Sequence, residues 1–308
     1  MPKLALTEIK RPGFSWINVT KPGQTELGAL GRRFDFLEVD LLDCAPPLQR
    51  PKLLAREKYL FLILLFPVFD HRTRKITPAE VDFFITKDLL VTIHNNSLAP
   101  LTAAAKAATK KLTKMEAEGK NPVGLLCHLL DALLESCFPM LTHLANDIDE
   151  IESRMTEVHH RKTIYEIFRL KTNIVNFEKS MQPHKATLRK LIELAPDYVP
   201  TDGLLPFFQK LVSHTKEIWD ALETNLKTLN AIEDTHLSLL NFRANDIVRT
   251  LTIFAVIVFP LTLLAAVFGM NTRATPIIGH PFDFWIILGF MILGTLGMLG
   301  YFKWKKWL

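Results

Sequence analysis

The last fifth of this 308-residue sequence has almost no charge. From residue 250 to residue 302 only Arg273 and Asp283 are charged, although the whole chain contains 37 Lys and Arg and 32 Asp and Glu. Apart from three lysines at the C-terminus, every other charge lies in the first 249 residues. This division excludes an intrinsically disordered chain, a wholly soluble enzyme and a many-span transporter built from repeats. It predicts a cytosolic portion followed by a membrane-embedded tail.

Signatures of common chemistry are also scarce. The three cysteines, Cys44, Cys127 and Cys137, form no C-x-x-C pair, which argues against a disulfide framework or a structural zinc site. A phosphate loop, a nucleophile elbow and an H-E-x-x-H motif are missing, so we expect neither ATP-driven pumping nor an enzyme. The net charge is +5, but the sequence contains no basic block with interleaved aromatics, so no nucleic-acid partner is expected. The N-terminus shows no cleavable signal peptide, which predicts that this portion stays in the cytosol.

Residues 1–97 mix short apolar runs with turn signals and predict a cytosolic α/β or α+β domain. The run at 59–69 is too short to cross a bilayer and is typical of a buried central strand. A short helix is expected over 25–34, with Thr25 as its N-cap. Further strands are expected over 14–20, 81–85 and 89–93, the last two as a hairpin.

The rest of the chain before the tail is helical in pattern. Residues 98–204 predict paired long helices, one opening at Asn121-Pro122 and continuing to about residue 159, and one over 161–194 with an interruption near Pro183. From residue 205 no glycine occurs until Gly269. One helix of that length would be about 100 Å long, which indicates a stalk over 205–249 that continues into a membrane.

Two segments of the tail, residues 250–308, are apolar enough to span a bilayer. Residues 250–268 and 285–302 carry no charge, and each is about one bilayer thickness long as a helix. Two spans make a hairpin whose ends lie on one side, and basic residues flank both ends. By the positive-inside rule both termini are cytosolic in a multi-pass protein of the inner (plasma) membrane. The flanking residues are Arg243, Arg249, Lys303, Lys305 and Lys306.

Two helices cannot enclose an aqueous path, so transport would require a symmetric oligomer with one helix of each subunit along the axis. The first span has one face of suitable residues, at spacings of three and four: Leu251, Ala255, Phe259, Thr262 and Ala266. Rings of bulky apolar side chains can stop ions by dewetting. The same stripe is also compatible with packing of one helix against another.

Gly269-Met270-Asn271 ends the first span where it should reach the outside. Glycine can terminate a helix, and Asn271 would place a neutral amide at the mouth. Repeated around an axis, such amides form a ring of carbonyl dipoles. Because magnesium holds its water tightly, this ring would contact the hydrated ion through its waters.

Taken together, these residues resemble the CorA family of magnesium transport proteins. The likeness rests on Gly269-Met270-Asn271, the preceding Phe259-Pro260-Leu261-Thr262, Asn245 and the basic tail 301–308, and it covers essentially the whole chain. It implies a funnel-shaped homopentamer in the lipid bilayer that admits Mg²⁺ passively, with Co²⁺ and Ni²⁺ as secondary substrates. In this resemblance Asn271 is the selectivity-ring residue, Gly269 and Met270 hold its loop, Val248 and Leu251 form a hydrophobic constriction, and Phe259, Thr262 and Ala266 match further pore-facing positions.

The resemblance also implies feedback by cytosolic Mg²⁺. Asp234 matches an acidic stalk position that binds the regulatory ion between subunits. Its partner carboxylate is left open among Glu80, Asp82 and Asp88. An ion bridging these groups would hold the funnel closed, and its loss would let the carboxylates repel and the subunits loosen.

Two departures from the family pattern bear on ion uptake. The loop after Asn271 has no acidic residue and contains Arg273, and Ala266 stands where a glycine is common. Two alternatives remain open. One is a zinc transporter of the ZntB type, and the other is a membrane-anchored helical scaffold whose hairpin only tethers it.

Overall fold

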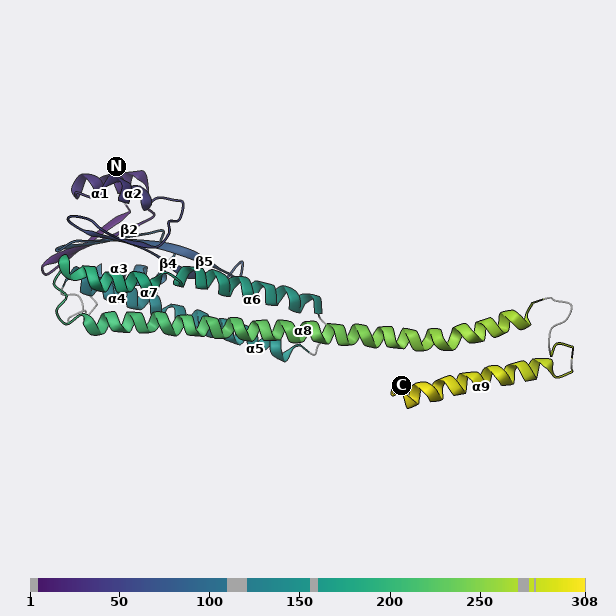
Figure 1. Ribbon diagram of the computed structural model, residues 1–308. Helices are drawn as coiled ribbons and strands as arrows, with labels where there is room; N and C mark the ends of the chain where they lie inside the picture. Colours follow the sequence, from purple (N-terminus) through teal and green to yellow (C-terminus); the bar gives the residue numbers. More distant parts are fainter. Residues whose placement is uncertain (1–4, 110–120, 156–159, 271–276, 280, 308) are drawn as a thin grey trace. The chain divides into compact units, whose positions relative to one another are not determined.

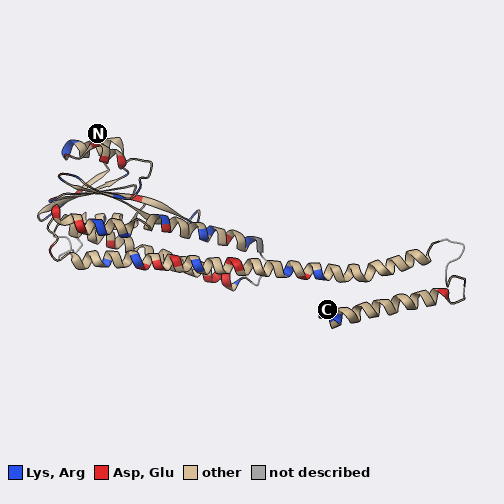
Figure 2. Cartoon of the chain, viewed as in Figure 1, with Lys and Arg blue, Asp and Glu red and all other residues tan. Residues whose placement is uncertain are grey.

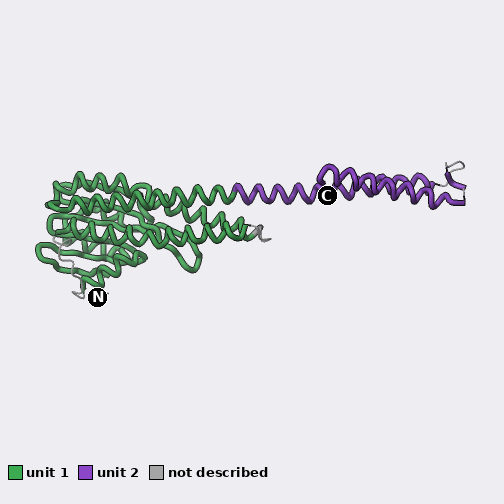
Figure 3. The backbone as a smooth tube through the Cα atoms, turned by 90° about the horizontal axis from the view of Figure 1, so that it is seen from below, with its two compact units in different colours: residues 1–233 green, residues 234–308 purple. Residues whose placement is uncertain are grey.

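The structure is a computed structural model that describes residues 5–109, 121–155, 160–270, 277–279 and 281–307. The chain separates into two compact units, residues 1–233 and residues 234–308 (Figure 3). The first unit contains a β-sheet with its covering helices, and the second contains the apolar tail. The long helix α8 begins in the first unit and ends in the second.

A six-stranded mixed sheet forms the centre of the first unit, in the order β1-β2-β6-β5-β4-β3. Only β2 and β6 pair in parallel, and the other four pairs are antiparallel. The strands are β1 (Leu6–Arg11), β2 (Phe14–Thr20), β3 (Lys52–Ala55), β4 (Leu60–Asp70), β5 (Lys75–Ile85) and β6 (Leu89–His94). The strand predictions over 14–20, 59–69, 81–85 and 89–93 are confirmed, and β5 begins six residues earlier than expected.

Helices cover both faces of this sheet, which is why its central strands are apolar on both sides (Figure 1). Helices α1 (Gln24–Arg33) and α2 (Glu38–Asp43) lie on one face, above β2 in Figure 1. On this face Ile63, Phe84 and Val91 belong to a buried cluster that includes Leu30 of α1 and Leu41 of α2. The opposite face carries α4, α6 and α7.

Helix α1 corrects one detail of the sequence analysis. Its N-cap is Gly23, with extended backbone, and Thr25 is already the second residue of the helix, so the prediction of Thr25 as the cap is wrong. The Leu27 N–H donates to the Gly23 carbonyl at 3.0 Å. Glycine is tolerated at an N-cap, and the preceding Pro22 cannot continue a helix backward, so the turn Pro22-Gly23 sets the start.

The helix expected from Asn121-Pro122 to about residue 159 is two helices, α4 (Pro122–Glu135) and α5 (Cys137–Ser153). The start is as predicted, because the Asn121 side chain accepts the Gly124 N–H at 2.8 Å. The break at Ser136 has a steric cause: Pro139 lacks an N–H, and its ring would clash with the carbonyl of Glu135, four residues earlier.

The remaining helices of the first unit agree with the sequence pattern. They are α3 (Ala99–Thr109), α6 (His160–Met181), α7 (His184–Leu194) and the short 3-10 helix η1 (Ala195–Asp197). The interruption expected near Pro183 lies between α6 and α7. Asn173 of α6 binds the β4–β5 hairpin through its side chain, accepting the Ile76 N–H and donating to the Arg74 carbonyl, both at 2.9 Å.

Helix α8 (Leu205–Phe268) is continuous over 64 residues and α9 (Asp283–Trp304) over 22. Charged residues are frequent in the first unit and in the early part of α8, and are nearly absent from the rest of α8 and from α9 (Figure 2). Of three described helical segments apolar enough to cross a membrane, Pro122–Ser153 is 56% buried in the protein, whereas the apolar windows of α8 and α9 are 6% and 0% buried. In the described part of the chain, almost none of the surface of these last two windows is covered.

A buried ion pair fixes α2 against the sheet. The Asp40 side chain is fully buried and binds the Arg56 guanidinium through both oxygens, with Nε–Oδ2 at 2.9 Å. The Tyr59 hydroxyl donates to the same Oδ2 at 2.6 Å and accepts the Leu37 N–H at 3.0 Å. The Asp40 carboxylate therefore accepts hydrogen bonds from two side chains, Arg56 and Tyr59, at once.

We expect Asp40→Ala to destabilise the first unit by roughly 3 kcal/mol, because it leaves the guanidinium and the hydroxyl without their buried partner. The value is at the low end for a broken buried pair, since Arg56 keeps 29% of its side-chain surface. Chemical denaturation of the purified protein, followed by circular dichroism, measures the change. The matched control is Asp35→Ala, which removes the exposed pair with Lys58 and should hardly move the midpoint. Equal effects of the two variants would contradict this account.

Candidate functional site

The residues of the expected pore face do lie on one side of α8. Val248, Leu251 and Phe259 are 61%, 67% and 71% exposed, although all three are large and apolar. Thr262 and Ala266 are exposed and Ala255 is half-buried. Because the helix is unbroken from residue 248 to residue 266, spacings of three and four keep these side chains on one face. The Thr262 hydroxyl donates to the Val258 carbonyl at 2.8 Å, so it presents oxygen lone pairs outward.

The end of α8 is tightly wound. The Gly269 N–H donates to the Ala265 carbonyl at 2.9 Å, and the Met270 N–H donates to the Val267 carbonyl at 3.3 Å. A Cβ added at Gly269 would lie 2.9 Å from the Ala265 oxygen, closer than real Cβ contacts allow. Glycine is therefore required sterically where the helix ends. Asn271, the expected selectivity residue, and Arg273 lie outside the described residues.

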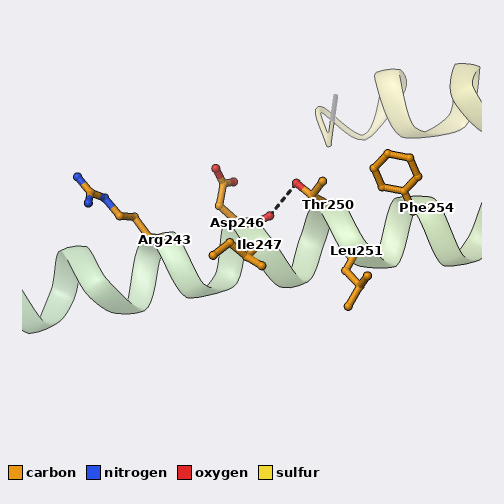
Figure 4. A pocket seen from close by; sticks show the side chains of 6 residues that line it. All are labelled: Arg243, Asp246, Ile247, Thr250, Leu251 and Phe254. Atoms are coloured by element: carbon orange, nitrogen blue, oxygen red, sulfur yellow. Dashed lines mark hydrogen bonds between the residues drawn. The ribbon is translucent and has the colours of Figure 1, made fainter. Parts of the chain in front are cut away.

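A shallow cavity of about 520 Å³ marks the change from charged to apolar sequence along α8 (Figure 4). Two charged residues, Arg243 and Asp246, lie at one end of it, and Leu251 and Phe254 lie at the other. The Thr250 hydroxyl donates to the Asp246 carbonyl at 2.9 Å. All six lining residues belong to the second unit: Arg243, Asp246, Ile247, Thr250, Leu251 and Phe254.

The C-terminal tail binds back to α8 within the second unit, a contact that sequence analysis missed. The Arg249 guanidinium donates to the Lys306 carbonyl and lies 5.8 Å from the centre of the Trp307 ring. Trp307 stacks on Phe302 at 5.8 Å, and Phe302 is only 4% exposed. The basic tail is thereby held beside the charged end of the apolar segment. Arg249 and Trp307 are far apart in the sequence, so no local pattern predicts that they meet. The only sequence signal was that one residue is a cation and the other an aromatic residue.

The four carboxylates expected to bind regulatory magnesium have different surroundings. Asp234 is exposed on α8, and Asp88 is exposed in the β5–β6 turn, where it accepts a hydrogen bond from the Thr86 hydroxyl at 3.0 Å. Glu80 is partly buried and accepts the Gln49 N–H. Asp82 is 2% exposed. Of the three candidate partners, Asp88 alone has an exposed side chain.

Asp82 lies within the apolar layer between the sheet and α2. Its neighbours in register are Ile63 on β4 and Ile93 on β6, and its Oδ1 atom has no hydrogen-bond partner among the described residues. Burial, reinforced by the negative charge of Glu80, raises the pKa of the Asp82 carboxyl well above its usual range. Burial likewise raises the pKa of the Cys44 thiol, and the Asp82 carboxyl adds to that shift.

Over the part of the chain that the structure describes, no group of three or more His, Cys, Asp or Glu is placed to hold a metal ion. The structure therefore gathers the predicted pore residues on one helix face. Of the candidate partner acids, Glu80 and Asp82 line one cavity, whereas Asp88 lies in the β5–β6 turn.

Comparison with known proteins gives a consistent family. A family model described as "CorA-like Mg2+ transporter protein" matches residues 12–305. The cobalt/magnesium transport protein CorA of Thermotoga maritima is 27% identical over 298 residues, covering 96% of this chain and 83% of that protein. The putative metal ion transporter YfjQ of Bacillus subtilis is 26% identical, covering 100% and 94%.

The fold is also similar to that of a solved CorA structure. The complete structure of the CorA magnesium transporter from Methanocaldococcus jannaschii superimposes with a TM-score of 0.86 over 100% of both chains, at 22% sequence identity. At that identity the likeness concerns the fold. It confirms the expected arrangement of an N-terminal α/β domain, a long helix and apolar C-terminal helices.

The raised pKa of Asp82 predicts a pH-dependent effect of Asp82→Asn. A carboxyl whose folded pKa is raised stabilises the protein fully only below its unfolded pKa, near 4, and that contribution is lost as pH rises toward the folded pKa. The asparagine variant lacks this loss. The difference in unfolding midpoint, variant minus wild type, should therefore increase from pH 5 to pH 8. Thermal unfolding at both pH values measures it, with Asp88→Asn, an exposed acid of the same hairpin, as control. A difference independent of pH would contradict the assignment.

Proposed function

The chain belongs to the CorA family of Mg²⁺ transporter proteins, and we propose that it is a passive channel carrying Mg²⁺ into the cytosol. The observation that carries the proposal is the exposed face of α8, which has no charge from Thr250 onward and ends at Gly269-Met270-Asn271. An anchoring helix needs only apolar side chains. It would not require an uncovered row of small, hydroxyl and bulky side chains followed by an amide, so this row argues against a scaffold.

The exposed helices support an oligomer in a bilayer. The apolar window of α8 is 6% buried and that of α9 is not buried at all, so both need lipid or other copies of the chain to remove them from water. One subunit supplies one pore helix, and a water-filled path needs several around an axis. We propose a homopentamer, with α8 of each subunit next to the axis.

The basic tail supports a topology with both termini in the cytosol. Lys303, Lys305 and Lys306 follow α9, and Arg243 and Arg249 precede the apolar part of α8. Positive residues are retained on the cytosolic side. The contact of Arg249 with Trp307 and the Lys306 carbonyl brings these two basic groups together, as expected if both lie at one membrane surface. We propose that this is the inner (plasma) membrane.

The membrane potential supplies the driving force. A divalent ion gains about 4.6 kcal/mol per 100 mV when it moves to the negative side. The sequence has no phosphate loop that would support ATP-driven uptake. The large apolar residues Val248 and Leu251 stand near the cytosolic end of the uncharged face. In the closed channel, the Val248 and Leu251 side chains of all subunits would form two apolar rings around the axis, which exclude water and so block the ion.

Selection would occur at the other end, where Asn271 amides bind the hydrated ion through its waters. The relative from Thermotoga maritima is named for both cobalt and magnesium, which supports Co²⁺ as a further substrate, with Ni²⁺ as a related case. Zinc transport is the alternative to be distinguished by flux. Arg273, which follows the filter, is expected to lower the rate of cation uptake unless it pairs with an acid such as Asp283.

We further propose that cytosolic Mg²⁺ closes the channel by binding at Asp234 together with a carboxylate of a neighbouring subunit. Asp234 is exposed on the stalk, and no metal-binding group of three forms within the described part of one chain. Among the three candidate partners, exposure favours Asp88 over Glu80 and the buried Asp82. Binding at the subunit boundary stabilises the closed state, so loss of the ion shifts the population toward the open state.

Asn271→Ala should reduce Mg²⁺ uptake by roughly tenfold or more, because each lost amide contact costs about 1 kcal/mol and a ring loses several. Uptake is measured in cells that lack their own magnesium transport, with assembly checked by size-exclusion chromatography. Asn225→Ala, which removes an amide from the cytosolic part of α8, is the control. Full uptake by an assembled Asn271→Ala protein would exclude the selectivity role.

Asp234→Asn should weaken inhibition by cytosolic Mg²⁺ and leave a conducting channel, because it removes one charged ligand of the closing ion. Currents recorded at a series of cytosolic Mg²⁺ concentrations give the inhibitory concentration, which should rise. Asp220→Asn removes an exposed carboxylate elsewhere on α8 and should not change it. If the two variants behave alike, Asp234 is a surface charge.

A further inference from the structure

A cavity of about 480 Å³ opens beside the end of α2, far along the chain from the proposed ion path. We call it the α2 cavity. Its floor is buried and includes Cys44, Asp82 and His94, whereas Pro46, Pro47 and Leu48 at its rim are exposed. The lining comes from the β2–α1 turn, the segment after α2, β5 and the end of β6, and it also includes Lys21, Glu80 and Ile93.

Asp82 is the unusual residue in this cavity. It is 2% exposed, stands in register between two isoleucines, and its Oδ1 has no hydrogen-bond partner in the described structure. A buried carboxyl oxygen without a partner costs stability, and an apolar residue would suit the strand better. Such a group is explained if a ligand supplies the missing donor.

The remaining polar groups argue against a metal ion as that ligand. Both nitrogens of His94 are engaged, Nε2 with the Asn18 amide oxygen at 3.1 Å and Nδ1 with the Asn96 N–H at 3.1 Å. The Cys44 thiol donates to the Asp40 carbonyl at 3.3 Å. Two carboxylates then remain, and the described residues contain no cluster of three ligands. Cysteine and histidine cannot complete a coordination shell here.

An alkylammonium ion fits the same surroundings. Its N–H groups are strong donors for a carboxylate, and its positive charge would favour the ionised form of Asp82 against the effect of burial. Glu80, partly buried in the same wall, adds a second negative charge. The proline and leucine side chains at the rim, with Ile93 below, offer an apolar surface to an aliphatic chain. Lys21, exposed at the rim, would repel a second positive charge. Apolar walls with a few convergent polar groups are typical of a small-molecule site.

We propose that the α2 cavity binds a small aliphatic primary ammonium ion with a single positive charge, whose nitrogen donates to Asp82. This goes beyond ion transport and does not depend on it. The site lies wholly within the first unit, and its ligand chemistry differs from that of a hydrated divalent cation.

The experiment measures binding of n-butylammonium chloride to the full-length protein in detergent micelles by isothermal titration calorimetry. We expect saturable binding to wild type, and no binding of n-butanol, the neutral analogue of the same size. Asp82→Asn should weaken binding at least about tenfold, because a charge-assisted hydrogen bond is lost. Lys21→Met should strengthen it. Asp88→Asn, which changes an exposed acid outside the cavity, should leave the affinity unchanged. Partitioning of n-butylammonium into the micelle is the same for all variants, so it cancels when they are compared.

Leu48→Trp provides a second test that leaves the buried acids untouched. Leu48 is 51% exposed at the rim, so tryptophan there should fold and should obstruct the mouth, which lowers affinity. Equal binding by wild type, Asp82→Asn and Leu48→Trp would overturn the proposal. Displacement of n-butylammonium from wild type by MgCl₂, beyond the effect of NaCl at equal ionic strength, would identify a divalent-cation site and overturn the assignment to an ammonium ion.

Discussion

The constraint on which this structure depends is the removal of two uncharged helical segments, the apolar windows of α8 and α9, from water. The apolar windows of α8 and α9 make almost no contact with the rest of their own chain. A bilayer satisfies the outer faces, because helices satisfy their own backbone hydrogen bonds there. It does not by itself explain the face that contains Thr262 and ends at Gly269. In the proposed oligomer, that face would line the axis around which several copies meet.

The same constraint explains how charge is used along α8. Its early part carries acids and bases that pair with neighbouring helices, as Lys210 does with Asp131 at 2.6 Å and Lys171 with Glu233 at 2.8 Å. Asp234, directly after that last pair, is exposed. From Thr250 onward the helix has no charge at all. In the proposed channel, this one helix would join the cytosolic Mg²⁺ site at Asp234 to the ion path, and a change in subunit contacts at Asp234 would be transmitted along it.

Much of the fold was predictable because its signals are long. A single helix was expected from residue 205 into the membrane, because the sequence has no glycine before Gly269, and α8 is continuous over 64 residues. Strands with strong apolar character, such as 59–69, were found as well. The missed elements, β1, β3 and α2, are four to six residues long and too short to show a period. The break before Cys137 was overlooked because the apolar pattern continues through it, while Pro139 acts sterically on a carbonyl four residues away.

The candidate site likewise has one part that local sequence spacing predicts and one part that depends on the tertiary fold. Spacing alone placed Leu251, Ala255, Phe259, Thr262 and Ala266 on one face, because helix geometry is local. Tertiary burial is not local. The sequence presented Glu80, Asp82 and Asp88 as equivalent acids, whereas folding buries one between isoleucines and leaves another on a turn. The contact of Arg249 with Trp307 likewise depends on how α8 and the tail meet.

The central claim is that the uncharged face of α8 conducts divalent cations selectively. It is tested most directly by flux into liposomes that contain the purified protein, under a set membrane potential, with magnesium, cobalt, nickel and zinc supplied separately. The account predicts potential-driven Mg²⁺ uptake, with Co²⁺ and Ni²⁺ carried as well. Uptake of zinc in preference to magnesium, or no uptake of any of the four ions, would contradict it.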